Sequence, residues 1–168
     1  WRIGGFSEIV APTPQVTPRG VLLTSGYSPV QPIVLVRHDA RGTLRLPEDD
    51  YFQSDASGDN VEPGIVWSRR RGGPYMATPV IHDGLLYTCG TSGIVGCYVA
   101  ATGQRLYKKR IRGDGASSFT GSPVAAGDAI YFPSEQGVIK IVKAGESFEL
   151  LGSPEIGEST LSTPAIAD

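Results

Sequence analysis

Short apolar runs separated by polar, glycine-rich turns recur along the chain in one fixed order. The clearest copy has four runs of β type, at 76–82, 85–89, 94–99 and 105–110. Asp83-Gly84, between the first two runs, is a strong hairpin signal because both positions tolerate a positive φ. No segment shows a sustained apolar period of 3.6 residues, so the pattern predicts an all-β chain with almost no helix.

A Thr/Ser-Pro pair opens each copy and marks the period. The pairs are Thr13-Pro14, Thr78-Pro79, Ser122-Pro123 and Thr163-Pro164. The last three marks lie 44 and 41 residues apart, a spacing typical of four-stranded propeller blades. We therefore expect 1–168 to form a single partial β-propeller, an arc of about three antiparallel four-stranded blades with partial ends. The expected blades are 10–71, 74–112 and 118–154, and a further blade starts at 159–168.

The first copy is longer, because the polar stretch 38–64 separates its runs 21–24 and 32–37 from the run 65–69. A structureless loop of this length is usually either functional or disordered, and both interpretations stay open. Its acidic residues allow a Ca²⁺ site, but their spacing is not that of an EF-hand and favours a solvated loop. These residues are Glu48, Asp49, Asp50, Asp55 and Asp59.

The two ends of the chain fall inside repeats. Trp1 precedes Thr13 by 12 residues, as Trp67 precedes Thr78 by 11, so we expect Trp1 to lie in the outer strand of a preceding blade. An arc of three blades leaves two open blade faces with apolar side chains, which tend to associate. We expect protein partners, or a second copy in a two-fold dimer, to cover these faces.

Composition narrows the function further. The net charge of −2 over 168 residues argues against a nucleic-acid partner, since such proteins usually carry a strong basic excess. No apolar run approaches the roughly 20 residues that span a bilayer, so we expect no membrane insertion. Arg69-Arg70-Arg71 and Lys108-Lys109-Arg110 fall at the ends of outer strands, where exposed charges oppose strand-to-strand aggregation.

In order and spacing, these motifs resemble the quinoprotein-like, or PQQ-like, β-propeller repeat. The second copy matches at Thr78-Pro79-Val80, Asp83-Gly84, Leu86-Tyr87, Ser92-Gly93, Ala101-Thr102-Gly103 and Leu106-Tyr107. The third matches at Ser122-Pro123-Val124, Ile130-Tyr131 and Gln136-Gly137. The resemblance covers nearly the whole chain except 38–64. It departs from the family at the outer-strand Trp, for which this chain has Tyr107 in one copy and Leu150 or Leu151 in another.

Quinoprotein dehydrogenases hold their quinone beside a vicinal disulfide, with Ca²⁺ and an acidic base, whereas this chain has no adjacent cysteines. The resemblance therefore implies a non-enzymatic member without cofactor or metal, which serves binding or assembly outside the cytoplasm. The alternative is a fragment of a quinone-dependent dehydrogenase, or of another propeller enzyme, whose catalytic residues lie in other blades. No nucleophile–base pair is found, so no catalytic residue is assigned.

Two sets of residues are candidates for binding or crosslinking. The loops that lead into the innermost strands place Tyr75, Met76, Phe119, Thr160 and Leu161 near the propeller axis, as ligand contacts or as packing between blades. Cys89 and Cys97 lie on two arms of one hairpin and are expected to face each other directly, as a cross-strand disulfide or as two free buried thiols. Short directly paired strands seldom reach good disulfide geometry, which favours the free thiols. His38 and His82 lie in different blades and predict no metal site.

Overall fold

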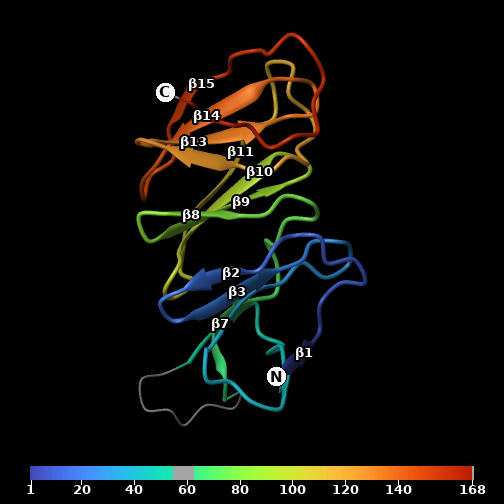
Figure 1. Ribbon diagram of the computed structural model, residues 1–168, viewed down its shortest axis with the longest axis vertical. Helices are drawn as coiled ribbons and strands as arrows, with labels where there is room; N and C mark the ends of the chain where they lie inside the picture. Colours follow the sequence, from blue (N-terminus) through green and yellow to red (C-terminus); the bar gives the residue numbers. More distant parts are fainter. Residues whose placement is uncertain (55–62, 168) are drawn as a thin grey trace.

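The computed structural model describes residues 1–54 and 63–167, and all regular secondary structure in them is β. Three antiparallel sheets, here called blades 1, 2 and 3, follow one another along the long axis of the molecule (Figure 1). This arrangement confirms the predicted all-β arc of propeller blades. No helix in the described part of the chain is long and apolar enough to cross a membrane.

Each blade begins at its inner strand and ends at its outer strand. Blade 1 contains β2 (Gln15–Thr17), β3 (Gly20–Thr24), β4 (Ile33–Val36), β7 (Ile65–Arg69) and β6 (Tyr51–Gln53). Blade 2 contains β8 (Val80–His82), β9 (Leu85–Gly90), β10 (Ile94–Val99) and β11 (Arg105–Arg110). Blade 3 contains β12 (Val124–Ala126), β13 (Ala129–Pro133), β14 (Ile139–Lys143) and β15 (Leu150–Gly152). A separate parallel pair joins β1 (Arg2–Gly4) to β5 (Thr43–Arg45), and 159–167 contains no strand.

The hairpins of blade 2 form where the sequence predicts them. Asp83 and Gly84 have φ values of 48° and 75°, which is the backbone of a two-residue hairpin turn, and His82 pairs with Leu85 across it. The first strand is shorter than the expected 76–82, since β8 starts at Val80, directly after Pro79, which has no backbone N–H for a ladder. In blade 3 the outer strand is also short and covers only residues 150–152.

The Thr/Ser-Pro marks are joined in space by a repeated hydrogen bond, here called the hydroxyl ladder. The backbone N–H of Thr13 donates to Oγ1 of Thr78 at 2.9 Å, and the N–H of Thr78 donates to Oγ of Ser122 at 2.9 Å. The N–H of Ser122 then donates to Oγ1 of Thr163 at 3.3 Å. Thr78 and Ser122 therefore each accept a hydrogen bond from the preceding mark and donate one to the next.

All three blades share a β-bulge between their third and fourth strands. In blade 1, Leu35 pairs with Trp67 and Val36 with Ile65; in blade 2, Cys97 pairs with Tyr107 and Tyr98 with Arg105. In blade 3, Ile141 pairs with Gly152 and Val142 with Leu150. The equivalent residues on the fourth strands are thus Trp67, Tyr107 and Gly152. The expectation of Leu150 or Leu151 at this position is wrong, because the bulge shifts the register by one residue.

Alternate side chains of each sheet pack against the next blade. Between blades 1 and 2, buried Leu22, Leu35 and Trp67 contact Leu86 and Tyr98. Between blades 2 and 3, Tyr87, Cys97 and Tyr107 lie with Ile130 and Phe132 in a second buried cluster. On the far side of blade 3, the alternation leaves Tyr131, Ile139 and Ile141 half-buried.

The face of blade 1 that is turned away from blade 2 is covered by a cap made of the N-terminal segment and the 38–64 insertion. Val34, Val36 and Ile65 of blade 1 are fully buried against Leu44, and Ile3 packs against the same cluster. The interpretation of 38–64 as a structureless loop is therefore wrong for its described residues, which contain β5 and β6. Asp55 and Asp59 lie outside the described residues, as does Asp168.

The cap also changes two expectations about the chain ends. β1 pairs with β5, so the segment next to Trp1 is part of the cap and not the outer strand of another blade. Ile3 from this segment supplies the apolar side chain that the bare face of blade 1 needs. The expectation of two open blade faces is consequently wrong for blade 1. Blade 3 keeps the half-buried apolar face described above.

Candidate binding site

A cleft of about 410 Å³ lies between blades 1 and 2, on the side of the molecule where 70–79 connects the two sheets. Its walls are formed by the β3–β4 loop, by the segment 70–79 (the connecting segment), and by parts of β9, β10 and β11. Its lining includes Gln31, Arg71, Tyr75, Thr88, Tyr98 and Lys108. Three of these are on strands of blade 2, so the blade itself holds half of the site.

Glycines bring the connecting segment close to the β3–β4 loop. The N–H of Gly73 donates to the carbonyl of Gln31 at 2.9 Å. A Cβ on Gly73 would lie 2.3 Å from the carbonyl oxygen of Ser25, and one on Gly26 would lie 2.3 Å from the carbonyl carbon of Pro74. Because backbone atoms occupy the space on both sides, only glycine fits at these two positions, and this wall of the cleft is fixed.

The floor of the cleft is the hydroxyl end of Tyr98. This hydroxyl would lie 2.6 Å from a Cβ on Gly72 and 2.6 Å from a Cβ on Gly96, so both glycines leave room for it. Burial raises the pKa of Tyr98, against an opposing hydrogen bond from Thr88 and the positive charge of Arg69. Tyr98 therefore stays a neutral phenol at physiological pH and offers a hydrogen-bonding group beside the buried Thr88.

The rim of the cleft is positively charged. Arg71 on the connecting segment and Lys108 on β11 are exposed, and neither is within ion-pair distance of a described acidic group. Tyr75 stands beside them and forms an aromatic pair with exposed Tyr27, with ring centroids 5.4 Å apart. Two unpaired cations beside a neutral polar floor favour an anionic group such as a carboxylate.

Arg69 connects the cap of blade 1 to this cleft. Its guanidinium lies 4.3 Å from the ring centre of Tyr51 on β6 and 5.4 Å from that of Tyr98, and its Nε donates to the carbonyl of Gly103 at 2.6 Å. Burial is the main cause that lowers the pKa of Arg69. The expectation that Arg69 is an exposed edge charge is wrong, because β6 covers the edge of β7.

The predicted ligand-binding residues are not brought together. Tyr75 lines the cleft, and Met76 follows it with 44% of its side chain exposed. Phe119 is only 1% exposed and packs in the core between blades 2 and 3, where a Cβ on Gly93 would lie 2.7 Å from its ring. Thr160 and Leu161 follow blade 3, far along the chain from the cleft; the N–H of Thr160 donates to Glu135.

Sequence reasoning missed Arg71, Lys108, Gln31 and Tyr98. The predicted binding residues all lie in loops that lead into the inner strands, whereas the cleft also includes side chains from β10 and β11. The glycines offered a signal. Gly73 leaves room for the backbone of the β3–β4 loop, and Gly72 and Gly96 leave room for the hydroxyl of Tyr98. A glycine inside a strand often marks such an approach.

The cysteines are both free and buried. The expected direct pairing is wrong: Cys89 pairs with Val95 and Cys97 with Tyr87, because the hairpin turn is centred on Ser92 and not on Gly93. Burial raises the pKa of Cys89, and raises that of Cys97 to about 11. On separate strands, the two thiols do not form the vicinal pair beside which quinoprotein dehydrogenases hold their quinone, so this set does not fit that cofactor.

No group of three His, Cys, Asp or Glu side chains among residues 1–54 and 63–167 is arranged to hold a metal ion. His38 and His82 lie in different blades, and each Nε2 is 2.9 Å from a backbone carbonyl, of Thr17 and Gly127 respectively. Glu48, Asp49 and Asp50 are exposed on the cap.

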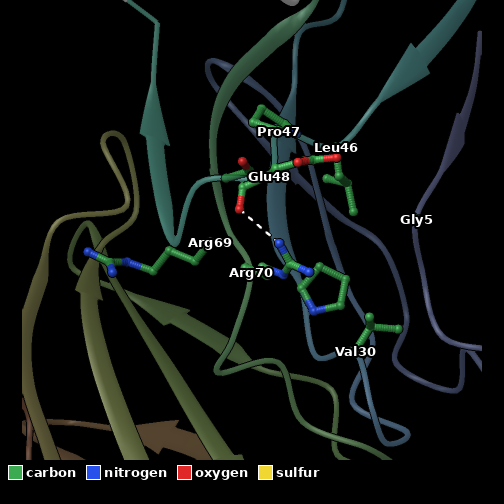
Figure 2. Close-up of a pocket in the computed structure, with 9 residues that line it drawn as sticks. Gly5, Val30, Leu46, Pro47, Glu48, Arg69 and Arg70 are labelled. Carbon is green, nitrogen blue, oxygen red and sulfur yellow. Dashed lines mark hydrogen bonds between the residues drawn. The ribbon is translucent and has the colours of Figure 1, made fainter.

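A smaller cavity, of about 170 Å³, lies between the cap and blade 1 (Figure 2). The side chain of Leu46 in the insertion extends toward Val30, and Nη1 of Arg70 donates to the backbone carbonyl of Glu48 at 3.0 Å. Arg69 extends the other way, toward blade 2 (Figure 2). The buried Ser68 hydroxyl lines the cavity without a hydrogen-bond partner among the described residues, which suits a single bridging water.

Comparison with known proteins shows the fold. No protein-family model and no curated protein matches the sequence. Among solved structures, a europium-containing methanol dehydrogenase matches with a TM-score of 0.50 and 13% identity, over 87% of this chain and 23% of that one. BamB from Moraxella catarrhalis matches with a TM-score of 0.42 and 14% identity, over 95% of this chain and 56% of that one. The match to the methanol dehydrogenase confirms the predicted β-propeller fold, and the chain spans less than two thirds of either protein.

Proposed function

We propose that this chain is a non-enzymatic binding or assembly scaffold of the quinoprotein-like propeller type, and that the cleft between blades 1 and 2 receives an acidic group of a partner protein. The observation that carries the proposal is the rim of the cleft. Arg71 and Lys108 are exposed and unpaired with any described acidic group, above the neutral hydroxyl of Tyr98. Cations beside a neutral polar floor favour the binding of anions.

Rigidity supports this role. The cleft wall at Gly26 and Gly73 has backbone atoms on both sides of each glycine, so the site is formed before a ligand arrives. A site that is already ordered loses less conformational entropy on binding. The two cations also stand on different elements, the connecting segment and β11, so an anion bound between them would join blade 1 to blade 2.

The experiment is a titration with fluorescein-labelled hexaglutamate, followed by anisotropy at low ionic strength. We expect saturable binding that weakens as salt is added. The double variant Arg71→Glu/Lys108→Glu should weaken it at least tenfold. Arg45→Glu, which reverses an exposed charge on β5 of the cap, is the matched control and should change it less than twofold. Equal binding by the double variant and the control would contradict the proposal.

Turnover is a separate test of the non-enzymatic part. The chain, supplied with PQQ, Ca²⁺ and a redox dye, should not oxidise alcohols or sugars. Reproducible dye reduction that requires the protein would contradict the non-enzymatic proposal. The enzyme-fragment alternative stays a prediction, and vicinal cysteines with repeated Trp-containing outer strands in the flanking coding sequence would support it. The expected location outside the cytoplasm also stays a prediction, and fractionation of the source cells tests it.

Self-association through blade faces is likewise a proposal, now limited to blade 3. Tyr131, Ile139 and Ile141 are half-buried on its far face, and Gly152 takes the position at which the other two blades carry an aromatic side chain. Light scattering after size exclusion checks it, because a dimer that Ile141→Lys converts to a monomer is the expected result.

A further inference from the structure

β7 and β11 occupy equivalent places in neighbouring blades. Each pairs with the third strand of its blade, each carries the shared bulge, and Trp67 and Tyr107 stand at the same position. Counting from that position, Ser68, Arg69 and Arg70 correspond to Lys108, Lys109 and Arg110. The outer edges of the two strands can therefore be compared residue by residue.

The edge of β7 is occupied by β6. The two strands are antiparallel, and Phe52 pairs with Ser68. On either side of this pair, the N–H of Ser54 donates to the carbonyl of Val66 at 2.8 Å, and the N–H of Arg70 donates to the carbonyl of Asp50 at 3.2 Å. The outward backbone groups that β6 uses are thus those of Val66, Ser68 and Arg70.

The edge of β11 offers the same groups and has no strand on it. β11 is the last strand of its sheet, and no described segment pairs with its outer side. The N–H of Ile111 points inward, to the carbonyl of Gly93 at 2.9 Å. Because backbone groups alternate in direction along a strand, those of Lys108 and Arg110 point outward. They are the counterparts of Ser68 and Arg70.

The charges on β11 select the kind of strand that fits. Four of its six residues are cationic, namely Arg105, Lys108, Lys109 and Arg110. None forms an ion pair with a described residue. A second copy of β11 would bring like charges together, which disfavours pairing. An acidic segment would meet complementary charge instead. On blade 1, β6 follows Glu48-Asp49-Asp50 directly in the chain, and its Tyr51 stacks on Arg69.

The geometry points to the outer edge of β11 as a docking site for an extended acidic segment of a partner protein, which joins blade 2 as an antiparallel fifth strand with an aromatic residue opposite Lys109. β6 on blade 1 is the precedent within the same chain. The inference rests on the proposed binding function and names the partner class. Lys108 belongs to both sites, so an acidic residue of the bound strand lies within reach of the cleft rim.

The experiment uses a labelled nine-residue peptide with the sequence of 46–54, Leu-Pro-Glu-Asp-Asp-Tyr-Phe-Gln-Ser, titrated into the intact chain and followed by anisotropy. In the register of β6, the amide of the Phe residue points toward the receiving strand and that of the following Gln points away. N-methylation of the Phe amide should weaken binding at least tenfold. N-methylation of the Gln amide is the control and should change it less than twofold. Equal effects of the two methyl groups overturn the proposal.

A second measurement locates the peptide on the protein. At saturation, the amides of Lys108 and Arg110 should exchange with deuterium at least tenfold more slowly, while exposed amides on β15 keep their rates. Lys108→Pro removes the outward N–H without breaking an inward bond and should abolish binding, whereas Lys108→Ala should retain part of it. If Lys108→Pro does not fold, amide exchange in the unmodified chain decides. Unchanged exchange at Lys108 and Arg110 overturns the proposal.

The two proposals fail in different ways. Peptide binding that is lost with Arg71→Glu, but is insensitive to both N-methyl groups, supports the cleft and overturns the fifth strand. Binding that is lost with the Phe N-methyl group, but keeps its strength in Arg71→Glu, supports the fifth strand and overturns the cleft. Loss of binding in both supports the two sites together.

Discussion

The interface between blades 1 and 2 and the interface between blades 2 and 3 are built at equivalent positions by different means. In the first, Trp67 is fully buried, and its Nε1 donates to the carbonyl of Ala100 at 3.0 Å. In the second, Tyr107 meets Phe148 edge to face, with ring centroids 5.7 Å apart. The Tyr107 hydroxyl lies beside the Cys97 thiol without a well-formed hydrogen bond.

The difference shows that the residue at this one position sets how tightly two neighbouring blades pack. The shared bulge presents Trp67, Tyr107 and Gly152 in the same way. Trp67 fills its site and satisfies its one donor, whereas Tyr107 is smaller and leaves a buried hydroxyl unsatisfied. Gly152 presents no side chain, and it stands in the blade whose far face stays open. We therefore expect blades 1 and 2 to separate less readily than blades 2 and 3.

The largest effect is expected from Trp67→Ala. Removing a buried Trp leaves a cavity and costs about 3–5 kcal/mol, which urea unfolding followed by far-UV circular dichroism measures. Tyr107→Ala, the matched change at the second interface, should cost less, because its hydroxyl contributes no hydrogen bond. Equal losses of unfolding free energy for the two variants would show that the residue at this position does not set how tightly the blades pack.

Gly103→Ala should rank next. Gly103 has a φ of 73°, and a Cβ there would lie 2.3 Å from the ring of Trp67. Overpacking and a left-handed backbone together cost about 2–4 kcal/mol. The control is Gly145→Ala in the corresponding turn of blade 3, where the φ is 145° and nothing lies within 4 Å of the new Cβ. Thermal unfolding should show the larger fall in Tm for Gly103→Ala, and the reverse order would refute the role of the Trp67 contact.

A smaller effect is expected from Tyr87→Phe. The N–H of Gly145 donates to the Tyr87 hydroxyl at 2.8 Å, and the loss of this hydrogen bond costs about 1 kcal/mol. Tyr107→Phe removes a hydroxyl without a well-formed bond and should leave stability unchanged or slightly higher. A loss for Tyr107→Phe as large as for Tyr87→Phe, in the same urea experiment, would mean that the Tyr107 hydroxyl is bonded after all.

The smallest effect on stability is expected from the ionisation of Tyr87 and Cys97 at the second interface. Burial raises the pKa of Tyr87 to about 12 and that of Cys97 to about 11, above the ordinary values of 10.0 and 9.0. Above pH 9 the unfolded chain therefore loses protons that the folded chain keeps, so stability falls as pH rises toward 11 to 12. Unfolding at pH 7.5 and pH 10 should show this fall, and Cys97→Ala should reduce it. A stability that stays flat over this range would contradict the buried cluster.

The sequence predicts the middle of each blade well and the periphery poorly. Residues 85–89, 94–99 and 105–110 form strands within one residue of expectation, because β-branched and aromatic residues are bounded there by glycine turns. β5 and β6 have three residues each and no alternation long enough to detect. Their formation depends on tertiary contacts, with the bare face of blade 1 and with the edge of β7.

The candidate site was predictable only in part, for a related reason. Tyr75 follows a Gly-Gly-Pro turn and could be placed at the entry to blade 2 from the sequence. Arg71 and Lys108 read as edge charges, since their positions on either side of one cleft depend on the twist between two sheets. The offset of Cys89 from Cys97 depends on where the hairpin turn is centred, and a shift of one residue moves every pair.

The hydroxyl ladder has a consequence for how such a chain tolerates change. Its three hydrogen bonds join residues 65, 44 and 41 apart in sequence, yet each spans the same step from blade to blade. Chain length between two marks is thus decoupled from the angular step about the axis. A blade can gain a long insertion at its periphery, as blade 1 has, while the step from one blade to the next stays the same. New binding surfaces can therefore form at the periphery of a blade while the hydroxyl ladder near the axis stays unchanged.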